Sequence, residues 1–316
     1  MSTQLLQGPR TVLEFEDALF PGVLRDIPNP PRRLHLIGDP TALAEGLAVV
    51  GARNATPYGL GCAKRFSGIA ARRGVTIVSG GARGCDSAAH RAAVEAGGKT
   101  VVVFGGGCDC IYPVRNFALF QQVIDAGGAV VSEYDWQCHP EPYMFRMRNR
   151  LIAGLSRATL IVEAGLPSGT FSTADEALSA GKEVWAVPGA ITSPKSAGAN
   201  YLISQGATPI ISDDAFLEAL FEVFGCMRFD GDAQDALAIG ANLDGIPEAF
   251  RAALEALASE QLRLEDIFAC VREANPSMDQ KEVRDATMTG LAEAESRGII
   301  IRCPDGRYSV AVSQRT

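Results

Sequence analysis

The chain has 316 residues, of which 47% are hydrophobic and 7% aromatic, and its net charge is −8. This length is sufficient for a buried core of domain size with further segments attached. No run of 18 apolar residues occurs, and residues 1–10 lack the basic-then-apolar layout of a signal peptide. We therefore expect a cytoplasmic protein with no membrane-spanning helix.

Cysteine and histidine usage argues against a metal site. The chain has 8 cysteines and 3 histidines, and no Cys-x-x-Cys pair. The ligand spacing of zinc sites is absent, so the cysteines are expected to be reduced and mostly small core residues. No metal and no cofactor are predicted.

The charge is uneven along the chain. Residues 45–211 hold 15 Lys and Arg against 12 Asp and Glu, so this segment is +3 while the flanks are −11. A nucleic acid responds to local potential rather than to net charge. The acidic total is therefore compatible with a basic groove in the central segment.

Residues 1–44 are predicted to form an N-terminal lead-in. Five prolines lie between residues 20 and 40, so this stretch is expected to be extended.

Residues 45–212 alternate short apolar runs with helix-compatible stretches. The apolar runs are β-branched and lack in–out alternation, which is typical of strands covered on both faces; they occur at residues 47–50, 75–78, 100–104, 129–131, 159–162, 183–187 and 208–211. Helices are expected between them at residues 58–72, 86–96, 114–126, 148–155 and 170–180. This pattern predicts an α/β, Rossmann-like, doubly wound and mostly parallel sheet of about seven strands.

Glycines and arginines follow the expected strands. Glycines at 51, 80–81, 105–107 and 189 come just after strands, where ligands bind in open parallel sheets, although ordinary turn chemistry would explain about half of them. Arg53, Arg83 and Arg115 follow the first three strands. We expect these three guanidinium groups to meet at one edge of the sheet and to contact several phosphates of a polymer.

The densest basic cluster is FRMRNR at residues 145–150. If a helix begins near Arg148, then Arg148, Asn149 and Arg150 occupy its first turn, where cations are unfavourable unless a polyanion compensates. That conflict is expected at a functional site, although a solvated basic face is the simpler alternative.

A second cluster, PSGTFSTA at residues 167–174, lies between an expected strand and a helix. Small hydroxyl residues and glycine expose backbone N–H groups to a phosphate, which makes Ser168, Gly169 and Thr170 candidate binding residues. Simple N-capping by Ser168 or Thr170 is equally compatible.

Catalytic chemistry has little support. His90 lies inside an expected helix, where a local hydrogen bond is the simpler role, and no nucleophile–base pair or Walker A motif is found. We predict that the chain is not an enzyme.

The C-terminal third predicts a linker and a small domain. Residues 213–245 have an acidic, helix-then-loop composition typical of a linker. From residue 246 to 316, three helical periods and a short hairpin predict a winged-helix-like domain. With 9 Lys and Arg against 12 Asp and Glu, this domain is better suited to protein contacts than to duplex DNA.

Taken in order, these motifs resemble the DNA-processing A (DprA/Smf) family over roughly residues 20–212. The matching stretches are FP to GD at 20–39, VGAR at 50–53, SGGARGCDSAAH at 79–90, YPVRN at 112–116, SE at 132–133, RNRLIAGLS at 148–156, SGT at 168–170 and VPG at 187–189. The chain departs from the usual pattern at Ala52, Gly81, Cys85 and Arg146, the last of which adds a cation where the family usually has proline.

The resemblance implies a homodimer that binds incoming single-stranded DNA during natural transformation and loads it with the RecA recombinase. Carried over by position, it implies phosphate contacts by Arg53, Arg83, Arg115, Arg148 and Arg150, and an aromatic platform at Phe145. An alternative is a nucleotide-binding, phosphoribohydrolase-like enzyme, because residues 167–176 partly resemble the Pro-Gly-Gly-x-Gly-Thr loop of that superfamily. A protein scaffold is the third possibility.

Overall fold

The computed structural model describes residues 5–166, 168–225, 246–259, 262–297, 299–302 and 306–310. The chain divides into two compact units, Met1–Gly225 and Cys226–Thr316. Each unit has its own hydrophobic core. Within the described residues, no helix combines the length and the apolar character that crossing a bilayer requires.

The described part of unit 1 contains a nine-stranded sheet in the order β1-β2-β6-β5-β4-β3-β7-β8-β9. The strands from β6 to β9 in this order pair in parallel, which confirms the predicted mostly parallel α/β sheet. They are β3 (Gly46–Val50), β4 (Ile77–Ser79), β5 (Thr100–Val103), β6 (Ala129–Ser132), β7 (Ser156–Ile161), β8 (Glu183–Ala186) and β9 (Thr208–Pro209). Every residue of β3, β4, β5 and β6 is buried, as expected for strands covered on both faces.

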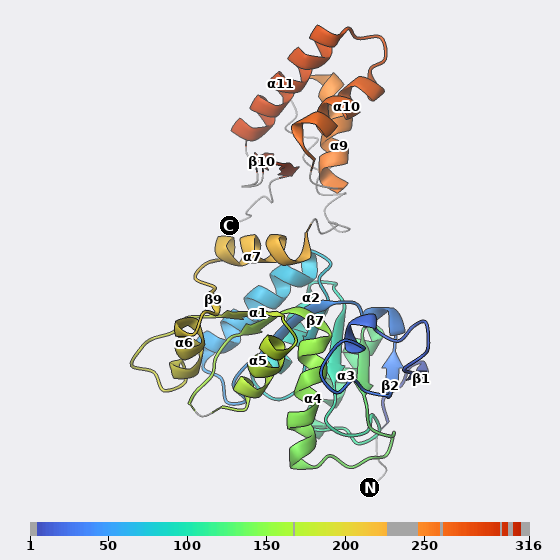
Figure 1. Cartoon of the computed structure of the whole chain (residues 1–316), viewed down its shortest axis with the longest axis vertical. Coiled ribbons are helices and arrows are strands. Elements are labelled where there is room, and N and C mark those ends of the chain that lie inside the picture. The colour runs from blue at the N-terminus through green and yellow to red at the C-terminus, as the bar shows by residue number, and fades with distance from the viewer. Residues whose placement is uncertain are drawn as a thin grey trace. The chain divides into compact units, whose positions relative to one another are not determined.

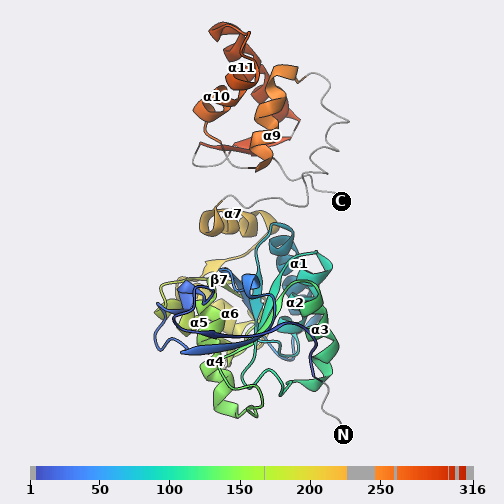
Figure 2. The same cartoon turned by 90° about the vertical axis from the view of Figure 1, so that its right-hand side faces the viewer.

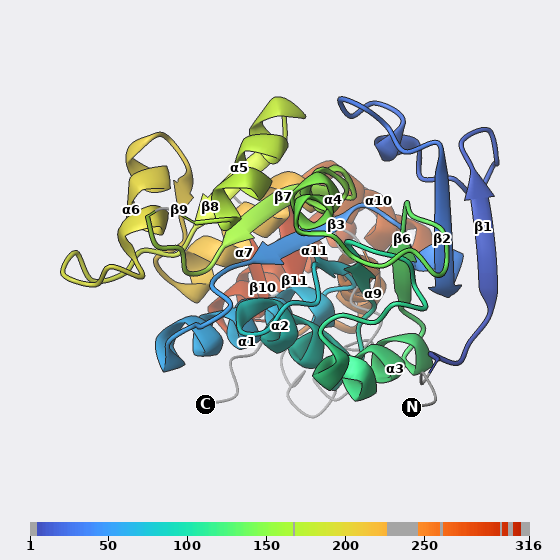
Figure 3. The same ribbon diagram turned by 90° about the horizontal axis from the view of Figure 1, so that it is seen from below.

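Helices cover both faces of the sheet, as Figure 3 shows. One face carries α1 (Pro57–Arg72), α2 (Cys85–Glu95) and α3 (Phe117–Asp125), and the other carries α4 (Pro142–Gly154), α5 (Thr170–Ser179) and α6 (Ala197–Ser204). From β3 the chain proceeds outward to β6 and then returns to β7 on the other side of β3. This reversal leaves a crevice beyond the carboxyl ends of β3 and β7.

The N-terminal lead-in is more ordered than the sequence predicted. It contributes β1 (Arg10–Glu14) and β2 (Arg33–Gly38), which add two antiparallel strands beside β6 at one side of unit 1 (Figures 1 and 2). Leu34, Leu36 and Ile37 of β2 are buried. The sequence did not predict these two strands, because pairing with a distant strand leaves no local signal.

The first residues of the predicted linker form a helix that belongs to unit 1. Helix α7 (Asp213–Phe224) is capped by the Ser212 hydroxyl, which accepts a hydrogen bond from the Ala215 N–H at 3.1 Å. Its Phe216 is fully buried against Phe66 and Trp185, with ring centroids 4.7 and 6.0 Å apart. Residues 226–245 of the predicted linker lie outside the described residues.

The described part of unit 2 contains three α-helices and a two-stranded sheet (Figure 1). Their bounds are α9 (Arg251–Ser259), α10 (Leu264–Ala274), α11 (Gln280–Ser296), β10 (Ile300–Arg302) and β11 (Tyr308–Val310), with a short 3-10 helix at Glu248–Phe250. A Cβ at Gly290 of α11 would lie 2.2 Å from the Phe250 ring, so these segments pack closely. The winged-helix assignment remains a prediction.

His90 is a core residue of unit 1. Its Nδ1 lies 2.7 Å from Thr100 Oγ1, and that hydroxyl donates to the Ile77 carbonyl at 2.7 Å. The hydroxyl proton is thus used, so Nδ1 must donate, and the buried Nε2 carries no proton and has no partner among the described residues. Burial, assisted by the positive charge of Arg148, lowers the pKa of His90 to about 3.

Replacing Phe216 by Ala is expected to destabilise unit 1 by about 3–5 kcal/mol, because a fully buried ring leaves a cavity between α1, α7 and β8. Urea unfolding followed by circular dichroism measures the change. The Leu178→Ala variant, whose side chain is 60% exposed, should change stability by less than about 0.5 kcal/mol. Equal effects of the two substitutions would contradict the described packing of α7.

The depressed pKa of His90 makes stability depend on pH. As pH falls below 6.5 the unfolded chain takes up a proton at this histidine and the folded chain does not, so stability falls. Between pH 7.5 and 5.5 the wild type should lose about 1.4 kcal/mol more unfolding free energy than a His90→Asn variant. Identical pH dependence of the two proteins in urea titrations would refute this role.

Candidate nucleic-acid interface

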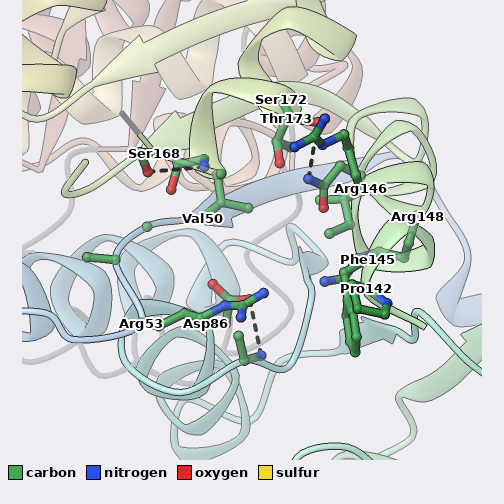
Figure 4. A pocket seen from close by; sticks show the side chains of 17 residues that line it. Val50, Arg53, Asp86, Pro142, Phe145, Arg146, Arg148, Ser168, Ser172 and Thr173 are labelled. Carbon is green, nitrogen blue, oxygen red and sulfur yellow. Dashed lines mark hydrogen bonds between the residues drawn. The ribbon is translucent and has the colours of Figure 1, made fainter. Parts of the chain in front are cut away.

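A pocket of unit 1 lies at the point where the strand order reverses. It has a volume of about 430 Å³. Four segments form its walls: the loop after β3, the segment from the end of β4 into α2, helix α4, and the start of α5 after β7. Figure 4 shows Arg53 and Asp86 on one side, Pro142 and Phe145 on a second side, and Ser168, Ser172 and Thr173 on a third.

A buried carboxylate joins two of these walls. Glu163, directly after β7, accepts hydrogen bonds from the Thr56 N–H at 2.8 Å and from the Thr56 hydroxyl at 2.9 Å. Thr56 Oγ1 in turn accepts the Gly59 N–H and caps α1. The end of β7 and the start of α1 are therefore held together, which fixes the Arg53 loop relative to α5.

Helix α4 differs from its prediction. It begins at Pro142, six residues before Arg148, and proline at the first position is a favourable helix start. Arg148, Asn149 and Arg150 therefore lie in the interior of the helix. The expectation that they form the first turn of the helix, with unfavourable cations, was wrong. The prediction overlooked Glu141 and Pro142, which mark the start of α4.

Arg148 is buried rather than presented to solvent. Only 5% of the residue is exposed, and its Nη1 donates to the Gly80 carbonyl at 2.8 Å and to the Val103 carbonyl. A Cβ at Gly80 would lie 2.5 Å from Nη2, so only glycine allows this approach. Burial lowers the pKa of Arg148 to about 10. The negative charge of Asp86 acts to raise this pKa, and the positive charge of Arg53 acts to lower it. The guanidinium group therefore stays charged at neutral pH.

Arg150 faces a different neighbour. Its Nη2 donates to Glu133 at 2.5 Å, and the two side chains are 9% and 16% exposed. Arg150 does not line the pocket. Its charge is neutralised by a carboxylate, so the geometry does not support the predicted phosphate contact of Arg150.

A second, smaller pocket of about 60 Å³ extends the first. Both are lined by Arg53, Ala82, Phe145 and Arg148, and the smaller one adds Arg83 and Tyr112. We call the two together the arginine groove. The rings of Tyr112 and Phe145 lie 5.3 Å apart, and the Arg53 guanidinium lies 5.9 Å from the Phe145 ring centroid.

The groove gathers most of the residues predicted from sequence. Those that line it are Arg53, Arg83, Phe145, Arg148, Asn149, Ser168, Gly169 and Thr170. Ser168 Oγ accepts the Thr170 N–H at 3.2 Å, and Asn149 Nδ2 donates to Ser172 Oγ at 3.4 Å. Arg115 is exposed in the short helix Val114–Asn116, next to groove residues Tyr112 and Pro113, but does not itself line the groove.

Several residues that line the groove were not among the predicted site residues, including three with charged or aromatic side chains. Arg146 is exposed at the rim of the larger pocket, and Asp86 and Tyr112 line the larger and the smaller pocket. Arg146 had a signal, since it replaces the proline usual in the resembling family. Asp86 lies in the first turn of α2, whose N-cap is Gly84, and accepts the Ala82 N–H at 3.2 Å.

The groove has an excess of positive charge. Arg53, Arg83 and Arg146 are exposed, and within the described part of the chain none of them forms an ion pair. Asp86 is the one carboxylate among the residues that line either pocket. Unpaired guanidinium groups beside an aromatic pair can bind anions and stack on flat rings.

Sequence comparison places these features in a family. The model of DNA recombination-mediator protein A matches residues 11–221. Protein Smf of Escherichia coli (strain K12) is 41% identical over 217 residues, which are 68% of this chain and 58% of that protein. The putative DNA processing protein DprA of Mycobacterium tuberculosis (strain H37Rv) is 38% identical over 264 residues, 83% of this chain and 64% of that protein. The chain thus spans less than two thirds of either relative.

Solved structures agree with the sequence matches. The DNA processing protein A of Streptococcus pneumoniae has a TM-score of 0.61 at 36% identity, over 66% of this chain and 73% of that one. A structure of DNA processing protein A from Helicobacter pylori, concerned with its single-stranded DNA binding mode, has a TM-score of 0.62 at 30% identity, over 68% and 97%. The family model covers well over half of the chain, and this chain belongs to the DNA recombination-mediator protein A family.

Proposed function

We propose that this chain binds single-stranded DNA in the arginine groove, with little preference for sequence. The observation that carries the proposal is the set of exposed guanidinium groups without ion-pair partners that lines one groove at the reversal of the sheet. The relative from Helicobacter pylori is known for its single-stranded DNA binding mode, which supports the same ligand here.

Two kinds of contact follow from the groove's composition. Arg53, Arg83 and Arg146 provide charge for sugar–phosphate oxygens, together with hydroxyl and backbone groups of residues 168–170. Phe145 and Tyr112 provide ring faces on which any base can stack. Neither contact distinguishes one base from another, so sequence preference is expected to be slight.

The family membership supports a wider role. We propose that the chain acts in the cytoplasm in natural transformation, forms a homodimer and loads RecA onto the bound strand, since recombination mediation is the description of its family. We further propose that unit 2 is a winged-helix-like domain that contacts protein, because residues 246–316 carry more acidic than basic side chains.

Removing two rim charges is the direct test. An Arg53→Ala/Arg83→Ala variant should bind a poly-dT oligonucleotide at least about tenfold more weakly at low salt, because two phosphate contacts are lost. The slope of log K against log salt should fall by about 1.4, which is about 0.7 per contact on a single strand. Fluorescence anisotropy at several salt concentrations measures both quantities.

The matched control removes two arginines elsewhere. Arg72 and Arg91 are exposed on α1 and α2 and line neither pocket, so an Arg72→Ala/Arg91→Ala variant should bind nearly as the wild type does. Equal losses of poly-dT affinity in both variants would show that net charge causes the effect. This result would contradict binding in the arginine groove. Release of free base from a nucleoside monophosphate by the wild type would instead favour the phosphoribohydrolase-like alternative.

The recombinase role has its own test. Adding the wild-type chain should speed the assembly of RecA on poly-dT, measured by the rate of ATP hydrolysis by RecA, and the Arg53→Ala/Arg83→Ala variant should give less stimulation at the same concentration. Light scattering of the wild type should give twice the 33.4 kDa chain mass. If the wild-type chain binds poly-dT but does not speed the assembly of RecA, the loading role is contradicted.

A further inference from the structure

A run of glycines after β5 packs against the segment that leads into α4. A Cβ at Gly105 would lie 2.8 Å from the Phe145 ring, and a Cβ at Gly107 would clash with the Asp135 carbonyl oxygen. Side chains at these positions would push the two segments apart. The glycine run therefore allows residues 135–145 to lie directly on the loop after β5.

Backbone hydrogen bonds join the same two segments through Gly107. The Gly107 N–H donates to the Cys138 carbonyl at 2.8 Å, and the Gly107 carbonyl accepts the Cys110 N–H at 2.9 Å. Close by, the Asp109 N–H donates to the Trp136 carbonyl at 2.8 Å. The peptide groups of two cysteines, Cys110 and Cys138, are thus hydrogen-bonded to one and the same residue.

The thiols of these two cysteines are free and partly exposed, whereas those of Cys85 and Cys108 are buried. Burial and the charge of Asp109 raise the pKa of the Cys110 thiol, and the charge of Cys138 adds to the increase. An electrostatic effect of one thiol on the other requires that they lie near each other. Cysteines on facing, hydrogen-bonded segments have the backbone proximity that a disulfide needs, and exposed disulfides are of the labile, regulatory kind.

We propose that Cys110 and Cys138 form a reversible disulfide when the chain meets hydrogen peroxide. The bond locks the segment that carries Phe145 to the loop that carries Tyr112. These two rings form the aromatic side of the arginine groove, so the modification acts on the walls of the groove. The inference depends on the two thiols alone and not on which ligand the groove binds.

The oxidation takes two steps and two electrons. The Cys138 thiolate attacks one peroxide oxygen, the O–O bond breaks, and a sulfenic acid and water are formed. The Cys110 thiol has the raised pKa and is the slower nucleophile toward peroxide, which assigns it the second step. It loses its proton and attacks the sulfenic sulfur, so that the S–S bond forms, the S–O bond breaks and a second water leaves. Each sulfur loses one electron, and hydrogen peroxide gains both.

Non-reducing peptide mapping tests the bond. The full chain is treated with hydrogen peroxide, the remaining thiols are blocked with N-ethylmaleimide, and the chain is digested with trypsin. Cleavage after lysine and arginine leaves Cys110 and Cys138 in two different peptides, residues 100–115 and 116–146. Mass spectrometry should detect these peptides as one linked species, and dithiothreitol should separate them.

Matched variants identify the two sulfur atoms. Cys110→Ser and Cys138→Ser should each abolish the linked species, and Cys62→Ser, which removes a partly exposed thiol of α1, should retain it. Cys108 lies in the same peptide as Cys110 but is fully buried, so Cys108→Ala should also retain the link. Circular dichroism monitors the fold of each variant. Loss of the link in a folded Cys108→Ala variant would assign the bond to the wrong thiol and overturn the proposal.

Thermal unfolding measures the lock itself. The disulfide closes a loop in the unfolded chain, so the oxidised wild type should melt about 5 °C or more above the reduced wild type. The Cys138→Ser variant should show no such increase after the same treatment. Equal melting temperatures of the oxidised and reduced wild type would contradict the lock.

Three results of the mapping would overturn the proposal. The first is two blocked, unlinked thiols at Cys110 and Cys138 after treatment with peroxide. The second is a link between two chains only, seen as a doubled mass on a non-reducing gel. The third is sulfinic acid at Cys138 in place of the link, because dithiothreitol does not reverse that product.

Discussion

The burial of one guanidinium group organises the arginine groove of this protein. Arg148 reaches from the interior of α4 to the carbonyl groups of Gly80 and Val103, at the ends of β4 and β5. The arginine gives both carbonyls a charged donor. Its position requires glycine at residue 80, which explains in physical terms why a Ser-Gly pair follows the strand. The buried charge is then balanced by Asp86 and leaves the exposed arginines free for a ligand.

The arginine groove also depends on the reversal of strand order in the sheet. Because β3 and β7 are neighbours whose helices leave toward opposite faces, the loops after them separate and open a crevice. Glu163 holds the two sides of that crevice together through Thr56. The groove is therefore a property of rigid elements, which is the arrangement expected to hold a flexible strand with a small entropic cost in the protein.

The sequence predicted those features that depend on local pattern. Buried β-branched runs identified the parallel strands, and the position of Arg53 and Arg83 after strands correctly predicted that they line one groove. Prediction from the sequence failed where contacts between distant residues decide the structure. The β2 strand is stabilised by β6, nearly 100 residues away, and Arg150 is neutralised by Glu133 from a separate element. Spacing along a helix does not show whether an arginine faces solvent, a carbonyl or a carboxylate, so Arg146, Arg148 and Arg150 could not be distinguished from sequence alone.

The most direct measurement is photo-crosslinking of an oligonucleotide that carries 5-iodouracil, followed by mass spectrometry of the joined peptides. This base reacts with aromatic side chains that it contacts, and the groove has two such rings at Tyr112 and Phe145. Binding in the arginine groove predicts crosslinks concentrated in the peptides that contain these residues. Crosslinks confined to unit 2, or to aromatic residues outside the groove such as Tyr201 on α6, would contradict it.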